Sequence, residues 1–177
     1  MSDLTIRPAT PSDIAAVTAI YAPAVLLGTA SFELQPPSAE EMERRYLAIT
    51  AGGYPYLVAE KAGAVLGFAY ANAHRTRPAY RFTVEDSIYV ARDAQGAGVG
   101  GALLAALIQA TEARGYRQMI AIIGDSRQTA SIGLHRAAGF VFSGTLHSVG
   151  FKHGRWLDSV SMQRPLGAGD AAPPTEP

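Results

Sequence analysis

The chain has 177 residues, enough for one domain with a hydrophobic core. Apolar residues make up 48% and charged residues 17%, as in ordinary globular proteins, and 15 Lys and Arg balance 15 Asp and Glu. No bulk charge therefore favours binding to nucleic acid or to an anionic membrane surface. The absence of cysteine excludes disulfides, thiolate zinc sites and a cysteine nucleophile. No secretory signal follows Met1 and no apolar stretch is long enough to span a bilayer, so we expect a cytoplasmic protein.

The first part of the chain predicts one strand and two helices. Leu4–Arg7 has a strand pattern. The segment Thr10–Asp13 then favours the start of a helix, which Pro23 should end or kink. A capping box over Ser38–Glu41 opens a second helix, which Gly52-Gly53 closes.

The rest of the chain alternates strands with two further helices. Strands are predicted at Tyr56–Glu60, Val65–Ala73, Arg81–Val90, Gln118–Ile123, Phe140–Gly150 and Arg155–Met162. One helix carries a leucine stripe and ends at Gly115, and another spans Ser126–Ala138. The last two strands should form an antiparallel pair that turns at His153-Gly154. This mixture predicts an α/β (α+β) fold, in which helices cover a mixed sheet.

A glycine-rich turn lies between the Arg81–Val90 strand and the leucine-rich helix. It consists of Gln95, Gly96, Ala97, Gly98, Val99, Gly100 and Gly101. Glycines let the backbone approach a ligand closely, and the free N–H groups at a helix start favour an anion. A connection without a ligand is the alternative, but four glycines in six residues argue against it. The turn therefore predicts a phosphate-binding site.

The turn also fits the dinucleotide-binding fingerprint. Gly96-x-Gly98-x-x-Gly101 has the required spacing, and Asp125 lies where a ribose ligand is expected. That fingerprint should follow its strand almost directly, yet Ala91–Gln95 intervenes, and too little chain follows for a doubly wound domain. A P-loop is disfavoured because no Gly-Lys-Ser/Thr sequence ends the turn.

Several segments resemble one acetyltransferase family. The order Gln95-Gly-Ala-Gly98-Val-Gly100 is similar to the Gln/Arg-x-x-Gly-x-Gly/Ala turn with which GNAT acetyltransferases bind the pyrophosphate of coenzyme A (CoA). Four more segments resemble the phosphinothricin and methionine sulfoximine acetyltransferases of that family, namely Ala79–Val90, Ala130–His135, Ala138–Phe140 and Val149–Asp158. The similarity covers Ile6 to Leu166.

The resemblance implies the GNAT fold as a single domain over residues 1–166. That fold has one mixed, mostly antiparallel sheet of about six to seven strands flanked by helices, with two strands splayed at the acetyl-CoA site. Gly167–Pro177 is rich in Gly, Ala and Pro and is expected to be a disordered tail. The family also implies a homodimer that forms through Thr145–Met162.

The resemblance implies acetyl-CoA contacts beyond the turn. Free main-chain groups at Ile88, Tyr89 and Val90 are expected to pair with the pantetheine amides, as an added strand does. Gln128 and Ser131 lie near the start of the next helix, within reach of CoA, although relatives usually carry Asn at the first of these positions. No metal is expected, because the histidines are not paired with acids at ligand spacing.

Acetyl transfer to an amine needs a general base, and Glu85 is the candidate. It lies in the strand before the turn, and the resemblance places the family's catalytic glutamate at this position. Asp86 should point to the opposite face of the strand. Direct transfer needs no covalent intermediate, which agrees with a chain that has no cysteine. Protonation of the leaving thiolate stays open between His135, Tyr89 and water.

The predicted acceptor site consists of Arg75, Arg77, Phe32 and Glu85 itself. A guanidinium pairs well with the carboxylate of a free amino acid, and the family places substrate contacts near both arginines. In the family, the loop that holds Phe32 helps to cover the acceptor pocket. Solvated loop arginines and a core phenylalanine are the alternatives. The resemblance implies a small-molecule amine acceptor such as phosphinothricin, methionine sulfoximine or methionine sulfone.

Two other functions stay open. The acceptor could be a peptide N-terminus, a polyamine or an aminoglycoside. A cationic acceptor favours an acidic pocket, however, whereas Arg75 and Arg77 point to an anionic one. Alternatively, the chain is a non-catalytic module that binds CoA or a nucleotide.

Overall fold

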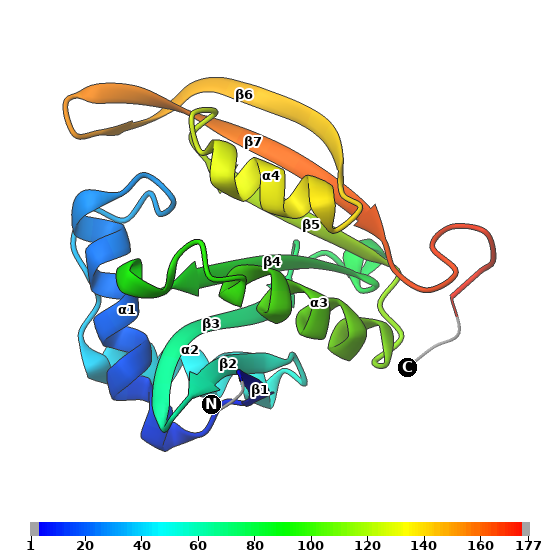
Figure 1. The fold of residues 1–177 in the computed structure, drawn as a ribbon. Coiled ribbons are helices and arrows are strands. Elements are labelled where there is room, and N and C mark those ends of the chain that lie inside the picture. The colour runs from blue at the N-terminus through cyan, green and yellow to red at the C-terminus, as the bar shows by residue number, and fades with distance from the viewer. Residues whose placement is uncertain (1–3, 175–177) are drawn as a thin grey trace.

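The computed structural model describes residues 4–174, which form one seven-stranded sheet with helices around it (Figure 1). The strands are β1 Thr5–Pro8, β2 Tyr56–Lys61, β3 Ala64–Ala73, β4 Thr83–Val90, β5 Gln118–Gly124, β6 Val141–Lys152 and β7 Arg155–Pro165. The α-helices are α1 Ile14–Leu27, α2 Ala39–Ala51, α3 Val99–Glu112 and α4 Thr129–Ala137. The strand order is β1-β2-β3-β4-β5-β7-β6. Only β4 and β5 pair in parallel among these strands, so the sheet is mixed and mostly antiparallel, as predicted.

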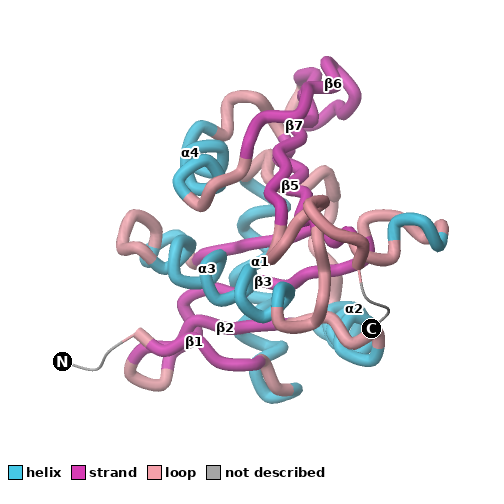
Figure 2. Tube along the Cα trace, turned by 90° about the vertical axis from the view of Figure 1, so that its right-hand side faces the viewer, coloured by secondary structure: helices cyan, strands magenta, loops and turns pink. Residues whose placement is uncertain are grey.

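Helices cover both faces of the sheet. Figure 2 shows α3 and α4 on one side of the strands and α2 on the other. On the α3 side, Leu103, Leu104 and Leu107 are fully buried in one hydrophobic core. On the α1 and α2 side, a second core joins Val17 to an aromatic group that includes Phe68. The sheet therefore lies between two separate apolar layers.

The first helix does not end at Pro23, which was one of the two outcomes expected there. α1 runs on to Leu27 with this proline inside it. Proline removes a backbone hydrogen bond and costs about 3 kcal/mol in a helix interior. Val17, Tyr21 and Val25 are buried on both sides of it, and burial of a large apolar side chain contributes about 1.5–3 kcal/mol. Packing against the sheet therefore outweighs the local cost.

The helix predicted over Ser126–Ala138 starts later, because α4 begins at Thr129. The Ser126 hydroxyl donates to Oδ2 of Asp158 at 2.6 Å. The Arg127 N–H donates to Oδ1 of Asp125 at 3.1 Å. These side-chain acceptors hold the first three residues in a turn instead of a helix.

The last two strands form a long hairpin, as predicted. Its turn residues His153 and Gly154 have φ of 52° and 72°, and both strands end later than expected. The first part of the predicted tail, residues 167–174, lies in turns. Arg117 donates to the carbonyls of Gly169 and Ala172 there, at 2.9 and 2.8 Å. The rest of the tail lies outside the described residues, so its disorder stays a prediction.

β4 and β5 separate part-way along their length (Figure 1). Residues 83–86 of β4 pair with residues 118–121 of β5, and the last pair is Asp86 with Ala121. Beyond it, residues 87–90 pair with β3, whereas residues 122–124 pair with β7. The main-chain groups of residues 87–90 that face β5 therefore have no strand partner. This is the splay that the resemblance implied.

Candidate active site

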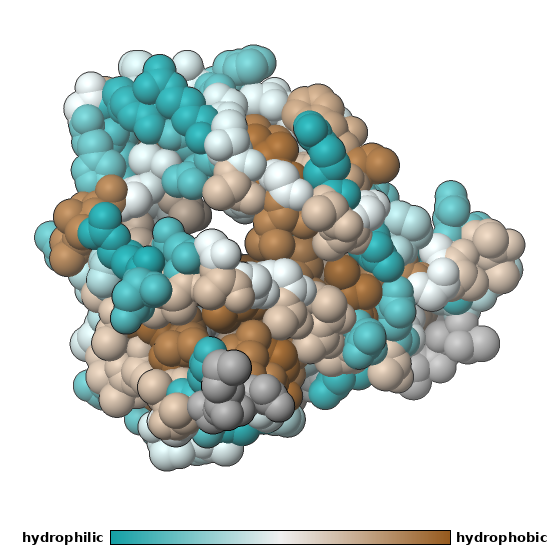
Figure 3. All heavy atoms as spheres, viewed as in Figure 1, coloured by the Kyte–Doolittle hydropathy of each residue, from teal (hydrophilic) through white to brown (hydrophobic). Residues whose placement is uncertain are grey.

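A cavity of about 480 Å³ opens where β4 and β5 separate. Its walls come from the end of β4, the glycine-rich turn, β5 and α4. Figure 3 shows an opening through the molecule in this region. The cavity therefore joins the α3 side of the sheet to the α1 side at the point where the two strands part.

Most of the residues predicted to bind the donor line this cavity. They are Ile88, Tyr89, Val90, Gln95, Gly96, Gly98, Val99, Gly100, Gly101, Gln128 and Ser131. Ala97 lies in the same turn but is not among the lining residues. The prediction did not name the lining residues of β5, which are Ala121, Ile122, Ile123 and Gly124, nor several from other elements, which are Ala24, Ala30, Asp86, Ser87, Ala94, Ala130, Leu134 and His135. No local motif predicts the β5 residues, because the pairing of β5 with β4 and β7 decides which of its residues face the cavity.

The glycine-rich turn has the geometry of an anion site. Gly96 and Gly98 have φ of 77° and 82°, a region that a residue with a Cβ rarely adopts. Gly98 is the N-cap of α3, so the N–H groups of the next residues begin the helix without an intrahelical partner. These N–H groups and the positive end of the helix favour a phosphate on the cavity side of the turn.

Glu85 lies on the α1 and α2 face of β4, opposite Asn72 in the neighbouring strand. Its Oε1 is 2.6 Å from Nδ1 of His74, and 29% of its side chain is exposed. The carboxylate is thus held in place and still accessible to a ligand. No local sequence pattern pairs these two residues. The pairing of β3 with β4 brings the two residues together, because its register sets His74 opposite Thr83 at the start of β4.

Asp86 points to the other face, as the alternation along β4 predicted. Its Oδ2 is 2.9 Å from Nε2 of His135, and both side chains are at most 5% exposed. Nδ1 of His135 is 2.8 Å from the carbonyl oxygen of Ser131. Burial lowers the pKa of His135, but the hydrogen bond and charge of Asp86 outweigh it and raise the pKa above its usual value. Both ring nitrogens thus face acceptor oxygens, an arrangement that favours the protonated ring.

The predicted acceptor residues are more dispersed. Neither arginine lines the cavity at the splay. The Arg75 guanidinium lies 5.6 Å from the centre of the Tyr80 ring, and Arg77 is an exposed residue that precedes a short 3₁₀ helix. Phe32 is 40% exposed, and its ring lies against the backbone of Gly124 and Gly150. Arg75 is nevertheless connected to the Glu85 region, because the Tyr80 ring also packs on His74.

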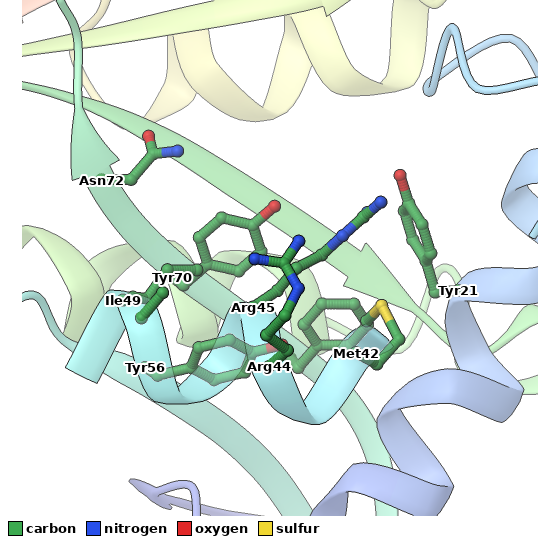
Figure 4. A pocket seen from close by; sticks show the side chains of 10 residues that line it. Tyr21, Met42, Arg44, Arg45, Ile49, Tyr56, Tyr70 and Asn72 are labelled. Carbon is green, nitrogen blue, oxygen red and sulfur yellow. The ribbon is translucent and has the colours of Figure 1, made fainter. Parts of the chain in front are cut away.

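A second cavity of about 250 Å³ lies between α2 and the sheet, on the face that carries Glu85 (Figure 4). Its floor is aromatic, with the rings of Tyr56, Phe68 and Tyr70 each stacked on the other two. In Figure 4 the amide of Asn72 and the hydroxyl of Tyr70 point to the same side. Oδ1 of Asn72 is buried without a hydrogen-bond partner. Strand periodicity marks these aromatic residues only as core, so their place at a cavity was not predicted.

Within residues 4–174, no group of three or more acidic or histidine side chains could hold a metal ion. In the same range, no helix is both long and apolar enough to cross a membrane.

Comparisons with known proteins agree with this geometry. Residues 6–161 match the acetyltransferase (GNAT) domain. The chain is 56% identical to a phosphinothricin N-acetyltransferase of Alcaligenes faecalis, over 96% of this chain and 86% of the relative. It is 43% identical to an L-methionine sulfoximine/L-methionine sulfone acetyltransferase of Pseudomonas paraeruginosa, over 95% and 98%. A crystal structure of a GNAT phosphinothricin acetyltransferase from Sinorhizobium meliloti with AcCoA superimposes with a TM-score of 0.95 and 52% identity, over 99% and 95%. The chain therefore belongs to the GNAT acetyltransferase family.

Proposed function

We propose that this acetyltransferase moves the acetyl group of acetyl-CoA to the α-amine of a small amino-acid-like acceptor. Phosphinothricin, methionine sulfoximine and methionine sulfone are the acceptors we expect. The observation that carries the proposal is the opening between β4 and β5. It has an anion site on one side and the accessible carboxylate of Glu85 on the other.

On the donor side, the N–H groups that follow Gly98 hold the pyrophosphate. The unpaired main-chain groups of residues 87–90 bind the pantetheine amides in place of a neighbouring strand. The arm then directs the thioester toward Asp86 and Ala121, where the two strands meet. This path positions the acetyl carbonyl next to Glu85, which precedes Asp86 in β4 and lies on the opposite face of the sheet.

On the acceptor side, Glu85 takes a proton from the ammonium group directly or through one water. The hydrogen bond with His74 holds the carboxylate in position. The neutral amine attacks the thioester carbonyl carbon, so a C–N bond forms, the C–S bond breaks and CoA leaves as a thiolate. The nitrogen releases its second proton to water as the amide forms. Arg75 pairs with the acceptor carboxylate, since the Tyr80 ring connects it to the His74 side of the site.

We assign water as the donor of the proton that the thiolate finally takes. His135 has no free N–H to donate, because Ser131 and Asp86 accept from both ring nitrogens. Burial raises the pKa of Tyr89 well above its usual value, which makes this hydroxyl a weaker acid than an exposed tyrosine. A thiolate is a sufficiently stable leaving group to depart without a side-chain acid.

We also propose that the protein is a cytoplasmic homodimer. Six apolar side chains of the hairpin are each more than half exposed, namely Val141, Phe142, Leu146, Val149, Phe151 and Trp156. An apolar surface of this kind supports a contact with a second copy. It lies on the predicted Thr145–Met162 segment and its flanks.

Replacing Gly98 with alanine tests the donor site. A Cβ there has nothing within 4 Å, so the change adds only backbone strain at φ +82°. A turn that relaxes away from this conformation must be restored on binding, at a cost of about 1–2 kcal/mol. We expect the Kd for acetyl-CoA, measured calorimetrically, to rise about 5- to 30-fold. Gly133→Ala, which has open space and no positive φ, is the control, and equal Kd values for both variants would contradict the assignment.

An acceptor screen tests the reaction. The purified protein is incubated with acetyl-CoA and each candidate amine, and both released thiol and acetylated product are measured. We expect N-acetylated phosphinothricin, methionine sulfoximine or methionine sulfone, with one equivalent of free CoA. Turnover of a polyamine or a peptide N-terminus, with none of these three amino acids, would refute the acceptor class.

A further inference from the structure

The loop of residues 28–33, between α1 and α2, is held firmly on its hairpin side. Nζ of Lys152 donates to the Ser31 carbonyl at 2.7 Å, and this lysine is buried. The carbonyl of Gly28 lies 3.1 Å from Nε2 of His153. Phe32, which lies in the same loop, packs against β5 and β6. We call residues 28–33 the acceptor loop, because Phe32 belongs to the proposed acceptor site.

Asp125 lies between this loop and the cavity at the splay. It follows β5 directly, is 2% exposed and has a φ of 117°. A residue with a side chain is strained in this region of φ, whereas glycine is not. The position of Asp125 is therefore maintained by contacts that its carboxylate makes. Such backbone outliers often occur at functional sites.

The Asp125 carboxylate accepts hydrogen bonds from three directions. Arg155 of β7 forms an ion pair with Oδ2. The hydroxyl of Thr29, from the acceptor loop, donates to the same oxygen at 3.2 Å, and the Arg127 N–H donates to Oδ1. Burial raises the pKa of Asp125, but these hydrogen bonds outweigh it and hold the pKa below its usual value. The carboxylate is thus an ionised contact between the hairpin, the acceptor loop and the start of α4.

Thr29 extends these contacts to the donor cavity. A carboxylate only accepts, so the Thr29 hydroxyl donates its proton to Asp125. Its oxygen then accepts from Nε2 of Gln128 at 2.9 Å, and Gln128 lines the cavity. The hydrogen bonds therefore run in one direction, from Gln128 through Thr29 to Asp125.

The backbone packs closely at the same place. A Cβ added to Gly124, which lines the cavity just before Asp125, would come within 2.6 Å of the Thr29 carbonyl oxygen. No side chain fits in that space without a shift of the loop. The wall of the donor cavity and the acceptor loop are thus in direct main-chain contact.

We propose that Asp125 is a positioning residue that couples the two substrate sites. Through Thr29 it fixes the acceptor loop at a set distance from the donor cavity, and CoA bound beside Gln128 immobilises that loop. The amino-acid acceptor rests on the proposed function, but the coupling itself does not. CoA alone should therefore act on the loop.

A pair of variants at Thr29 tests the coupling. Thr29→Val keeps the shape but removes the hydroxyl, so we expect the acceptor KM to rise about tenfold, as for the loss of one hydrogen bond, with kcat nearly unchanged. Thr29→Ser restores the hydroxyl and should bring the acceptor KM back to within about twofold of wild type. Thr50→Val, which removes a hydroxyl bonded only within α2, is the matched control.

A second measurement needs no turnover. Hydrogen exchange of residues 28–33 is followed with and without CoA. In the wild type and in Thr29→Ser, CoA should slow this exchange about tenfold, and in Thr29→Val and Asp125→Asn it should have little effect. Asparagine tolerates the positive φ and keeps the size of Asp125, so this variant removes the charge without adding strain.

These two readouts separate the inference from the proposed function. Equal acceptor KM values and equal CoA-induced protection in Thr29→Val and Thr29→Ser would overturn the coupling while leaving the acetyltransferase assignment intact. Absence of any acetylated amino acid with the wild type would overturn the proposed acceptor. In that case the exchange experiment would still decide the coupling, because it uses CoA alone.

Discussion

Replacing Glu85 with glutamine is expected to lower kcat by roughly 10²- to 10⁴-fold, the usual contribution of a general base. Glutamine has the shape of glutamate and can still accept a hydrogen bond from His74, but it cannot take the ammonium proton. The Kd for acetyl-CoA should stay unchanged, because Glu85 faces away from the donor cavity and is not among its lining residues. Steady-state kinetics and calorimetry on the same preparation measure both quantities.

The control for this change is Glu43→Gln on the exposed side of α2. It removes the same charge far from the splay and should leave kcat within about twofold, as surface substitutions do. If Glu85→Gln kept most of its activity, the proton would have to leave by another route and the assignment of Glu85 as base would be wrong.

Replacing Asp86 with asparagine is expected to destabilise the fold by about 3–5 kcal/mol, the cost of breaking one side of a buried ion pair. His135 would keep its bond to Ser131 but lose the carboxylate that stabilises its charge. The free energy of unfolding in urea measures this loss. Asp93→Asn, at an exposed carboxylate before the glycine-rich turn, is the control.

The same pair gives the protein a pH dependence of known sign. The pKa of His135 is raised in the folded state. Its contribution to stability is therefore complete below the unfolded pKa of about 6.5 and is lost as the pH rises through the folded value. The wild type should lose stability over this window, and Asp86→Asn should lose less. The contrary result is a free energy of unfolding that rises with pH above about 6.5 in the wild type but not in Asp86→Asn. It would show that the pair is not ionised as described.

Local sequence patterns were sufficient for the features that depend on one element. Alternation along β4 put Glu85 and Asp86 on opposite faces, and each contacts a histidine on its own side. The glycine-rich turn was readable because the left-handed φ of Gly96 and Gly98 requires glycine. The splay itself was predicted from the family resemblance, since the sequence of no single strand determines how β4, β5 and β7 pair.

Contacts between distant segments could not be predicted in this way. Thr29 and Asp125 are 96 residues apart, and Asp86 and His135 are 49 apart. No spacing rule links them, because each pair depends on how whole elements pack. Pro23 illustrates the same limit, since the helix continues through it only because buried neighbours outweigh its local preference.

The central claim is that donor and acceptor meet at the opening between β4 and β5, next to Glu85. A crystal structure of the ternary complex with CoA and methionine sulfone tests it most directly. We predict that the pantetheine arm lies between the two strands along residues 87–90. The acceptor amine should lie within hydrogen-bond distance of the Glu85 carboxylate, or one water away. An amine bound elsewhere, with no path to Glu85, would contradict the account.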